Sequence, residues 1–198
     1  MRPIFVGMEH HISRRIVLGA VLAAPFVNPL NAATRGFVLD KGRSEVHFSY
    51  YLEGRPGHCS IEVSQAQFQI DLADLSRSQV SVELDPRSIR AGFLPATEAL
   101  KSAQLLDARN HPVIRFTSQS IQPAGAGGHM TGDLSIRGVT RSERMVAQFI
   151  ETVPNHDVSE FGIQLSGQVN RDNYGVSGYS SFVGPQVDLR IRAYLRAV

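Results

Sequence analysis

The sequence predicts an all-β protein, a single antiparallel β-barrel of about eight strands with a short helix between two of them. From residue 36 onward, apolar and polar residues alternate with a period of two, which is typical of strands with one buried face. The 198 residues include 17 Gly and 10 Pro, which favour many turns over long helices. Hydrophobic residues make up 42% of the chain and charged residues 19%, which suits one packed domain and argues against disorder.

Several segments alternate apolar and polar residues, and each predicts one strand whose apolar set faces the core. In chain order these sets are Val46, Phe48, Tyr50 and Leu52; Val80, Val82 and Leu84; Ile114 and Phe116; Met130, Leu134 and Ile136; Phe161, Ile163, Leu165 and Val169; and Val187, Leu189, Ile191, Ala193 and Leu195. The segment 57–70 changes parity between Val63 and Phe68, which predicts a β-bulge near Gln65.

One stretch departs from the strand pattern and predicts a helix over 97–108. It contains helix formers, begins with Thr97 as a plausible N-cap, and lies between Pro95 and Pro112. Glycine-rich or turn-forming sequences at 125–128 and 154–157 predict hairpin loops, and Gly138 suits a tight hairpin.

A single open sheet of these strands would expose two edges, and closure into a barrel removes both. A barrel of about eight strands is just wide enough to hold its own side chains or one slender ligand. The alternation therefore leaves open whether the interior is filled or hollow.

Residues 1–33 have the parts of a secretory signal. The paired Arg14 and Arg15 precede an apolar run over 16–27, and the small residues Ala32 and Ala33 follow. The run is about a dozen residues long, shorter than the roughly 20 that span a bilayer. The arginine pair resembles a twin-arginine signal. We expect export to the periplasm with cleavage after Ala32 or Ala33, the alternative being an uncleaved membrane anchor.

The net charge of +2 falls on this segment, which holds three Arg against one Glu, so residues 34–198 balance to zero. A neutral domain lacks the electrostatic footprint of a nucleic-acid-binding protein, and no such partner is expected.

The chain shows no signature of catalysis, metal binding or a cofactor. Its single cysteine, Cys59, excludes an intrachain disulfide and a Cys-based zinc site, and is interpreted as a small core residue. The sequence contains no nucleophile elbow, phosphate loop or dinucleotide fingerprint. We therefore expect a protein that is not an enzyme and carries no cofactor.

Several local motifs occur together in a fixed order. They are Phe37-Val38-Leu39-Asp40 with Val46-His47-Phe48; His111-Pro112-Val113-Ile114-Arg115-Phe116; Gly132-Asp133-Leu134-Ser135-Ile136-Arg137-Gly138-Val139-Thr140-Arg141; and Arg171-Asp172-Asn173-Tyr174-Gly175-Val176. In this series the chain resembles the YceI-like family of polyisoprenoid-binding periplasmic proteins from about Gly36 to Val198.

The resemblance implies a lipocalin-like barrel with an elongated apolar cavity that holds an isoprenoid lipid of the polyprenyl quinone or phosphate type. The cavity would be lined by inward-facing residues, namely Phe48, Tyr50, Val82, Leu84, Ile114, Phe116, Leu134, Ile136, Ile163, Leu165, Leu189 and Ile191. It also implies a carrier that takes a lipid ligand and touches a membrane transiently; a homodimer is left open.

A polar end of the ligand would need hydrogen-bond donors at the barrel mouth. Arg171 and Tyr174, in a turn after a strand, and Arg141, after the Gly138 hairpin, are the candidates. For Arg171 the competing interpretation is an ion pair with Asp172 or Asp188 that only shapes the turn.

Two positions depart from the family pattern: Arg43 precedes Ser44 where a His is frequent, and Cys59 stands about where a Phe would be. Two other functions compete with the carrier: a filled-barrel structural or interaction protein without ligand, and an enzyme that acts on a lipid.

Overall fold

The computed structural model describes residues 34–150 and 158–198. The strands are β1 (Arg35–Leu39), β2 (Glu45–Leu52), β3 (Arg55–Ile70), β4 (Gln79–Arg90), β5 (Ile114–Ala124), β6 (Gly127–Ile136), β7 (Val139–Ile150), β8 (Glu160–Asn170) and β9 (Val183–Ala197). The helices are α1 (Leu94–Lys101) and the 3₁₀ turns η1 (Leu75–Arg77) and η2 (Arg171–Tyr174). The export segment 1–33 and the loop expected at 154–157 lie outside the described residues.

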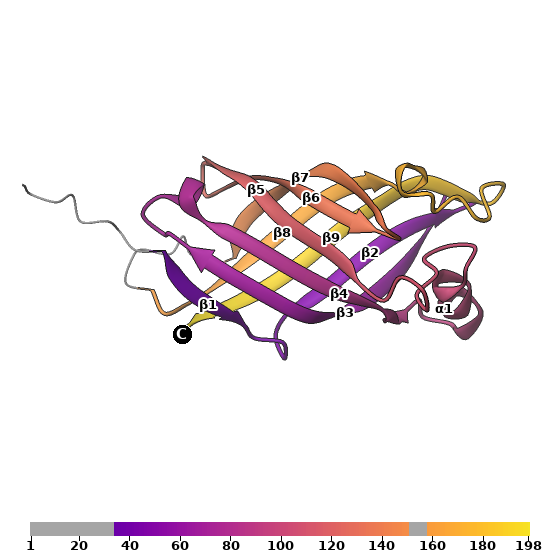
Figure 1. The fold of residues 1–198 in the computed structure, drawn as a ribbon, viewed down its shortest axis with the longest axis horizontal. Helices are drawn as coiled ribbons and strands as arrows, with labels where there is room; N and C mark the ends of the chain where they lie inside the picture. The colour runs from indigo at the N-terminus through magenta and orange to yellow at the C-terminus, as the bar shows by residue number, and fades with distance from the viewer. Residues whose placement is uncertain (1–33, 151–157) are drawn as a thin grey trace, which may run out of the picture. The chain divides into compact units, whose positions relative to one another are not determined.

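The strands form one antiparallel sheet in the order β1-β3-β2-β9-β8-β7-β6-β5-β4, and the pairing of β3 with β4 closes it (Figure 1). The result is an all-β fold, a closed eight-stranded barrel of β2 to β9 with one short α-helix. Every described strand of the wall is paired on both sides, which confirms the predicted closure into a barrel.

The short strand β1 occupies the same place in the sheet as β2, at the end of the barrel remote from α1 (Figure 1). It pairs with β3 at Phe37↔Phe68 and with β9 at Phe37↔Ala197. The strand β2 pairs with the other halves of the same two neighbours, as at Val46↔Ile61 and Val46↔Ile191. Together the two strands complete one position of the wall.

The hairpin predicted at Gly138 is confirmed. Ile136 pairs with Val139, so Arg137 and Gly138 form a two-residue turn with φ of 51° and 78°. Positive φ at both central residues matches the right-handed twist of the flanking strands. The β-bulge predicted near Gln65 is also confirmed, because the register of β3 against β4 shifts between Val63 and Gln65.

The expected helix exists, but its predicted bounds of 97–108 are wrong. It begins at Leu94 because Pro95 fits the first turn, where its missing N–H is not needed. Thr97 is not the N-cap: its hydroxyl donates to Phe93 O at 3.1 Å inside the helix. Beyond Lys101 the chain continues in successive turns, in which Asp107 has a φ of 45°.

Candidate ligand-binding cavity

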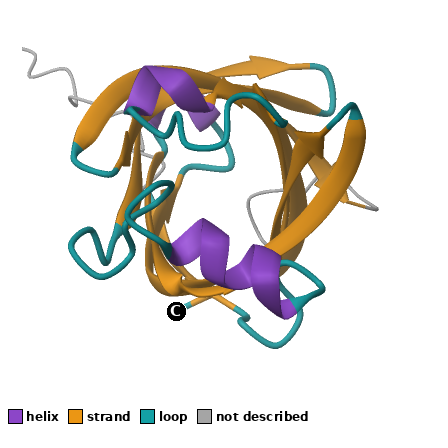
Figure 2. Cartoon of the chain, turned by 90° about the vertical axis from the view of Figure 1, so that its right-hand side faces the viewer, coloured by secondary structure: helices purple, strands orange, loops and turns teal. Residues whose placement is uncertain are grey.

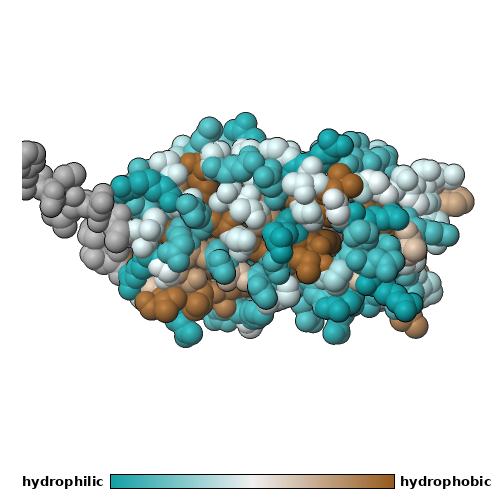
Figure 3. All heavy atoms as spheres, viewed as in Figure 1, coloured by the Kyte–Doolittle hydropathy of each residue, from teal (hydrophilic) through white to brown (hydrophobic). Residues whose placement is uncertain are grey.

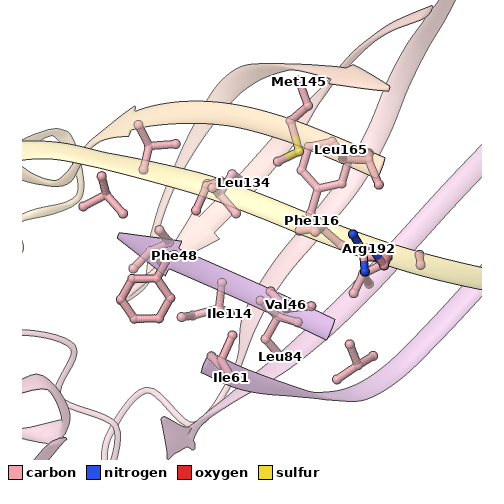
Figure 4. A pocket seen from close by; sticks show the side chains of 18 of the residues that line it. Val46, Phe48, Ile61, Leu84, Ile114, Phe116, Leu134, Met145, Leu165 and Arg192 are labelled. Carbon is pink, nitrogen blue, oxygen red and sulfur yellow. The ribbon is translucent and has the colours of Figure 1, made fainter. Parts of the chain in front are cut away.

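The barrel encloses a cavity of about 530 Å³. All nine strands and α1 contribute residues to its lining. Figure 4 shows side chains from opposite parts of the wall, such as Ile61 and Leu165, directed toward the same space. Inward-facing residues in the middle of the wall, such as Phe48, Val82 and Ile191, are only partly buried. The interior is therefore hollow, and the filled-barrel alternative does not describe this fold.

All twelve residues expected on the cavity wall lie on its lining: Phe48, Tyr50, Val82, Leu84, Ile114, Phe116, Leu134, Ile136, Ile163, Leu165, Leu189 and Ile191. Their role as lipid-binding residues stays a prediction. Tyr50 requires a glycine opposite it, because its ring lies over Gly57, where a Cβ would come within 2.4 Å of the ring.

The cavity is almost entirely apolar. Among the described residues that line it, the charged side chains belong to Arg171 and Arg192, and Arg192 is exposed. The described part of the lining includes no Asp, Glu, His or Lys. The described part of the chain also holds no group of three His, Cys, Asp or Glu residues placed to bind a metal ion.

Aromatic rings pack at the end of the cavity beside β1. The Phe161 ring makes edge-to-face contacts with Phe37 at 5.1 Å and with Phe149 at 5.9 Å between centroids. Such contacts are favourable geometries for aromatic pairs. Phe149 and Phe161 line the cavity, and the buried Phe37 packs against Phe161.

Figure 2 looks at the other end of the barrel, where α1 lies, and the cavity reaches the protein surface at this end. Leu52, Phe93, Tyr179 and Phe182 line the cavity there and are also exposed to solvent. They belong to the β2–β3 hairpin, the residue before α1 and the loop before β9. The alternating pattern identified Leu52 as an inward-facing residue. It did not identify Phe93, Tyr179 and Phe182, because these three stand outside the strands, where no period marks an inward face.

Arg171 is buried, with 6% of its surface exposed, and lies next to this opening. Its guanidinium donates to four main-chain carbonyl oxygens: Gly184 O at 2.9 Å, Val176 O at 2.6 Å, Gly178 O at 2.8 Å and Val183 O at 2.8 Å. The side chain therefore ties down the loop that carries Tyr179 and Phe182.

The ion pair expected between Arg171 and Asp172 or Asp188 does not form. Asp188 instead accepts from Tyr51 Oη at 2.5 Å and from Gln168 Nε2 at 2.8 Å, and these hydrogen bonds lower its pKa. Since a guanidinium has five N–H groups and four of those of Arg171 point to carbonyls, little is left for a ligand headgroup.

Tyr174 is fully buried, and its hydroxyl donates to Glu143 Oε1 at 2.7 Å. Burial, and then this hydrogen bond, raise the pKa of Tyr174 above its ordinary value. The sequence did not indicate this contact of Glu143. The pairing of β7 with β8 stops at Met145↔Gly167, so η2 can reach Glu143 beyond that point.

Arg141 is exposed on β7 and is absent from the cavity lining. Its Nε lies 3.4 Å from Asn173 O. The structure thus brings Arg141, Arg171 and Tyr174 together around η2, where each contacts protein groups.

Arg137 has a similar bracing role that the sequence did not indicate. Its guanidinium donates to Leu105 O and Gly175 O, each at 3.0 Å, and to Ala103 O at 2.9 Å. It joins the Gly138 hairpin to the turns after α1 and to η2.

No helix in the described ranges is long and apolar enough to cross a bilayer.

Comparison with solved structures finds the same fold. The crystal structure of Burkholderia cenocepacia BcnA superimposes with a TM-score of 0.72 at 18% identity, over 79% of this chain and 99% of that one. A polyisoprenoid binding domain from Saccharophagus degradans, implicated in plant cell wall breakdown, gives 0.59 at 12% identity, over 82% of this chain and 98% of that one.

Sequence comparison finds relatives among UPF0312 proteins. One from Vibrio cholerae is 26% identical over 171 residues, covering 76% of this chain and 87% of that protein. One from Ectopseudomonas mendocina is 33% identical over 85 residues, covering 42% of this chain and 44% of that protein. The model of the YceI-like domain matches residues 37–195. With most of its length matched and the barrel in place, the chain belongs to the YceI-like domain family.

Proposed function

We propose that this protein binds a long isoprenoid lipid, of the polyprenyl quinone or phosphate type, in its barrel cavity and carries it without altering it. The observation that supports this most directly is the apolar cavity of about 530 Å³, whose lining residues are exposed to solvent beside α1 and include aromatic rings at the end beside β1. The Saccharophagus degradans domain with the same fold is described as polyisoprenoid binding, which favours the same ligand class here.

The energetics favour a hydrocarbon chain. Each methylene group removed from water contributes about 0.8 kcal/mol, so a chain of several prenyl units outweighs the cost of ordering it. The described lining lacks acidic side chains and histidines, and the donors of Arg171 mostly face carbonyls. We therefore place the tail inside the barrel and the headgroup at the mouth, largely outside the wall.

Catalysis is not part of the proposal. A lipid-acting enzyme needs a nucleophile or a general acid–base pair facing its substrate. The described part of the cavity wall contains no cysteine, histidine or carboxylate. The paired arginines in the segment 1–33 support export to the periplasm, where such a carrier would work.

Native mass spectrometry of the protein from its host's periplasm is the first test, since a bound isoprenoid adds its mass to the folded protein. Titration with geranylgeraniol then compares two neighbouring substitutions. Ala147 lines the cavity, whereas Val146 is exposed on the outer face of the same strand.

We expect Ala147→Phe to occupy ligand space and weaken binding at least about tenfold, a free-energy change of about 1.4 kcal/mol. Val146→Phe should leave affinity unchanged. Equal affinity in both variants, or no binding of geranylgeraniol by the wild type, would overturn the proposed function.

A further inference from the structure

We propose that the mouth of the barrel docks on a lipid bilayer through an apolar ring, here called the mouth rim and made of Leu52, Phe93, Leu94, Tyr179 and Phe182. This inference rests on the proposed function, because the bilayer is the source of the lipid that the cavity takes. The ring would insert shallowly among the lipids, so that a ligand passes between bilayer and cavity.

Exposure of large apolar side chains is concentrated at this one end. Within the described ranges, every exposed Leu, Phe and Tyr belongs to the mouth rim, and the remaining exposed large apolar residues are valines. The exposed fractions are 43% for Leu52, 57% for Phe93, 70% for Leu94, 43% for Tyr179 and 56% for Phe182. Figure 3 shows polar side chains over much of this barrel face, with apolar patches between them. A clustered apolar patch of this kind marks an interaction site.

The mouth rim is held in place by the fold. Glu53 N donates to Phe182 O at 2.8 Å, which joins the β2–β3 hairpin to the loop before β9. Val183 N donates to Tyr179 O at 2.8 Å at the end of that loop. The guanidinium of Arg171 donates to the main-chain carbonyls of Gly178 and Val183 on either side of Tyr179 and Phe182. Because the ring is already ordered, little conformational entropy is lost when it meets a surface.

Its residue types and charges favour a neutral lipid surface. Phe and Tyr suit the boundary between lipid headgroups and acyl chains. Next to the rim in the sequence, Glu53 and Arg55 flank the hairpin turn, and Glu98 and Lys101 lie on α1, so two acidic and two basic residues stand beside it. Docking should therefore depend on apolar contact and only weakly on salt.

Continuity between rim and cavity argues for a bilayer over a protein partner. Leu52, Phe93, Tyr179 and Phe182 line the cavity as well as the opening. With a bilayer against this ring, a hydrocarbon chain moves from lipid to barrel without exposing its methylene groups to water, which would otherwise oppose transfer.

The test uses Leu94, which is the most exposed rim residue and is absent from the cavity lining. Leu94→Glu places a carboxylate in the first turn of α1, where the helix dipole tolerates it. Val146→Glu, on the outer barrel wall, is the matched control, and Leu94→Phe is the conservative variant. Each is measured by co-sedimentation with phosphatidylcholine vesicles at low and high salt, beside titration with geranylgeraniol in solution.

We expect Leu94→Glu to bind vesicles about tenfold more weakly than the wild type, whereas Val146→Glu and Leu94→Phe bind normally at both salt concentrations. All variants should take up geranylgeraniol with wild-type affinity. Vesicle binding by Leu94→Glu equal to that of Val146→Glu would overturn the docking surface. So would a wild-type dimer that Leu94→Glu converts to a monomer in sedimentation velocity, since the rim would then join two copies. If the wild type binds vesicles but does not bind geranylgeraniol in solution, that result would count against the proposed function alone.

Discussion

At the scale of single residues, we expect the buried side chain of Arg171 to contribute strongly to the stability of the fold. A buried guanidinium that donates to four carbonyl groups holds the loop 176–184 against the end of β8. We expect Arg171→Met to lower the free energy of unfolding by about 3 kcal/mol, because the carbonyl groups lose charged donors and cannot all regain water. Urea unfolding measures the loss.

Arg144→Met is the control, since Arg144 is exposed on β7. A loss for Arg171→Met no larger than for this control would show that the carbonyl contacts contribute little. Weakened geranylgeraniol binding by Arg171→Met with unchanged stability would instead restore the headgroup role.

Cys59 gives stability a pH dependence on the alkaline side. Burial raises the pKa of its thiol to about 12, whereas an unfolded cysteine titrates near about 8.5. The unfolded chain alone releases the proton between these values, so this contribution is complete below about pH 8.5 and is lost as the pH rises through 12.

Cys59→Ala removes that titration. The variant should be less stable at neutral pH by about 1 kcal/mol, because it leaves a small void. Urea unfolding at a series of pH values should then show the gap to the wild type narrowing above about pH 8.5. A gap that stays constant would mean that the thiol is hydrated in the folded state.

Particular residues of the site show what could be predicted from the sequence and what could not. Alternation placed all twelve expected wall residues on the cavity lining, because side-chain direction in a strand follows from parity alone. The partners of Arg171 were missed because they are main-chain carbonyls, which leave no trace in the residue types. Glu143 was missed because η2, far along the chain, supplies its partner Tyr174.

At the scale of elements, the β6–β7 hairpin depends on one glycine. Gly138 has a φ of 78°, a conformation that costs an L-residue with a branched side chain about 1 to 2 kcal/mol. We expect Gly138→Val to lose this much stability in thermal or urea unfolding. Gly36→Ala is the control, because a Cβ there meets its neighbours at 3.7 Å or more. Equal stability of the two variants would contradict a turn that requires positive φ.

Element boundaries were harder to predict than element types. The helix 97–108 was expected from Thr97 and from helix formers that extend past Ser102. The structure begins it at Leu94 and ends it at Lys101, since Thr97 bonds back to Phe93 and the residues after Ser102 make turns. Capping depends on main-chain geometry that tertiary contacts decide, so propensity alone fixes it poorly.

At the scale of the whole molecule, localisation to the periplasm is a prediction that rests on residues 1–33. Changing both Arg14 and Arg15 to Lys keeps the charge but removes the paired arginines that a twin-arginine signal requires. We expect the variant to accumulate in the cytoplasm, as measured by fractionation and immunoblotting. Periplasmic protein at the wild-type level would show that another export route suffices, and a mature protein that begins at Met1 would contradict cleavage near Ala33.

The position of β9 between β2 and β8 in the barrel wall has a kinetic consequence. Among the described strands, β2 and β8 pair on those sides with β9 alone, and Tyr194 N donates to Ser44 Oγ across 150 positions of the chain. Pairings so distant in sequence make folding slow, because a long loop must close before they form. A nascent chain that stops before Val183 would present two unpaired strand edges, and the apolar faces that line the cavity would be exposed to water. We expect the enclosed space to arise in one late, cooperative step, so that synthesis through β9 precedes any loading of lipid.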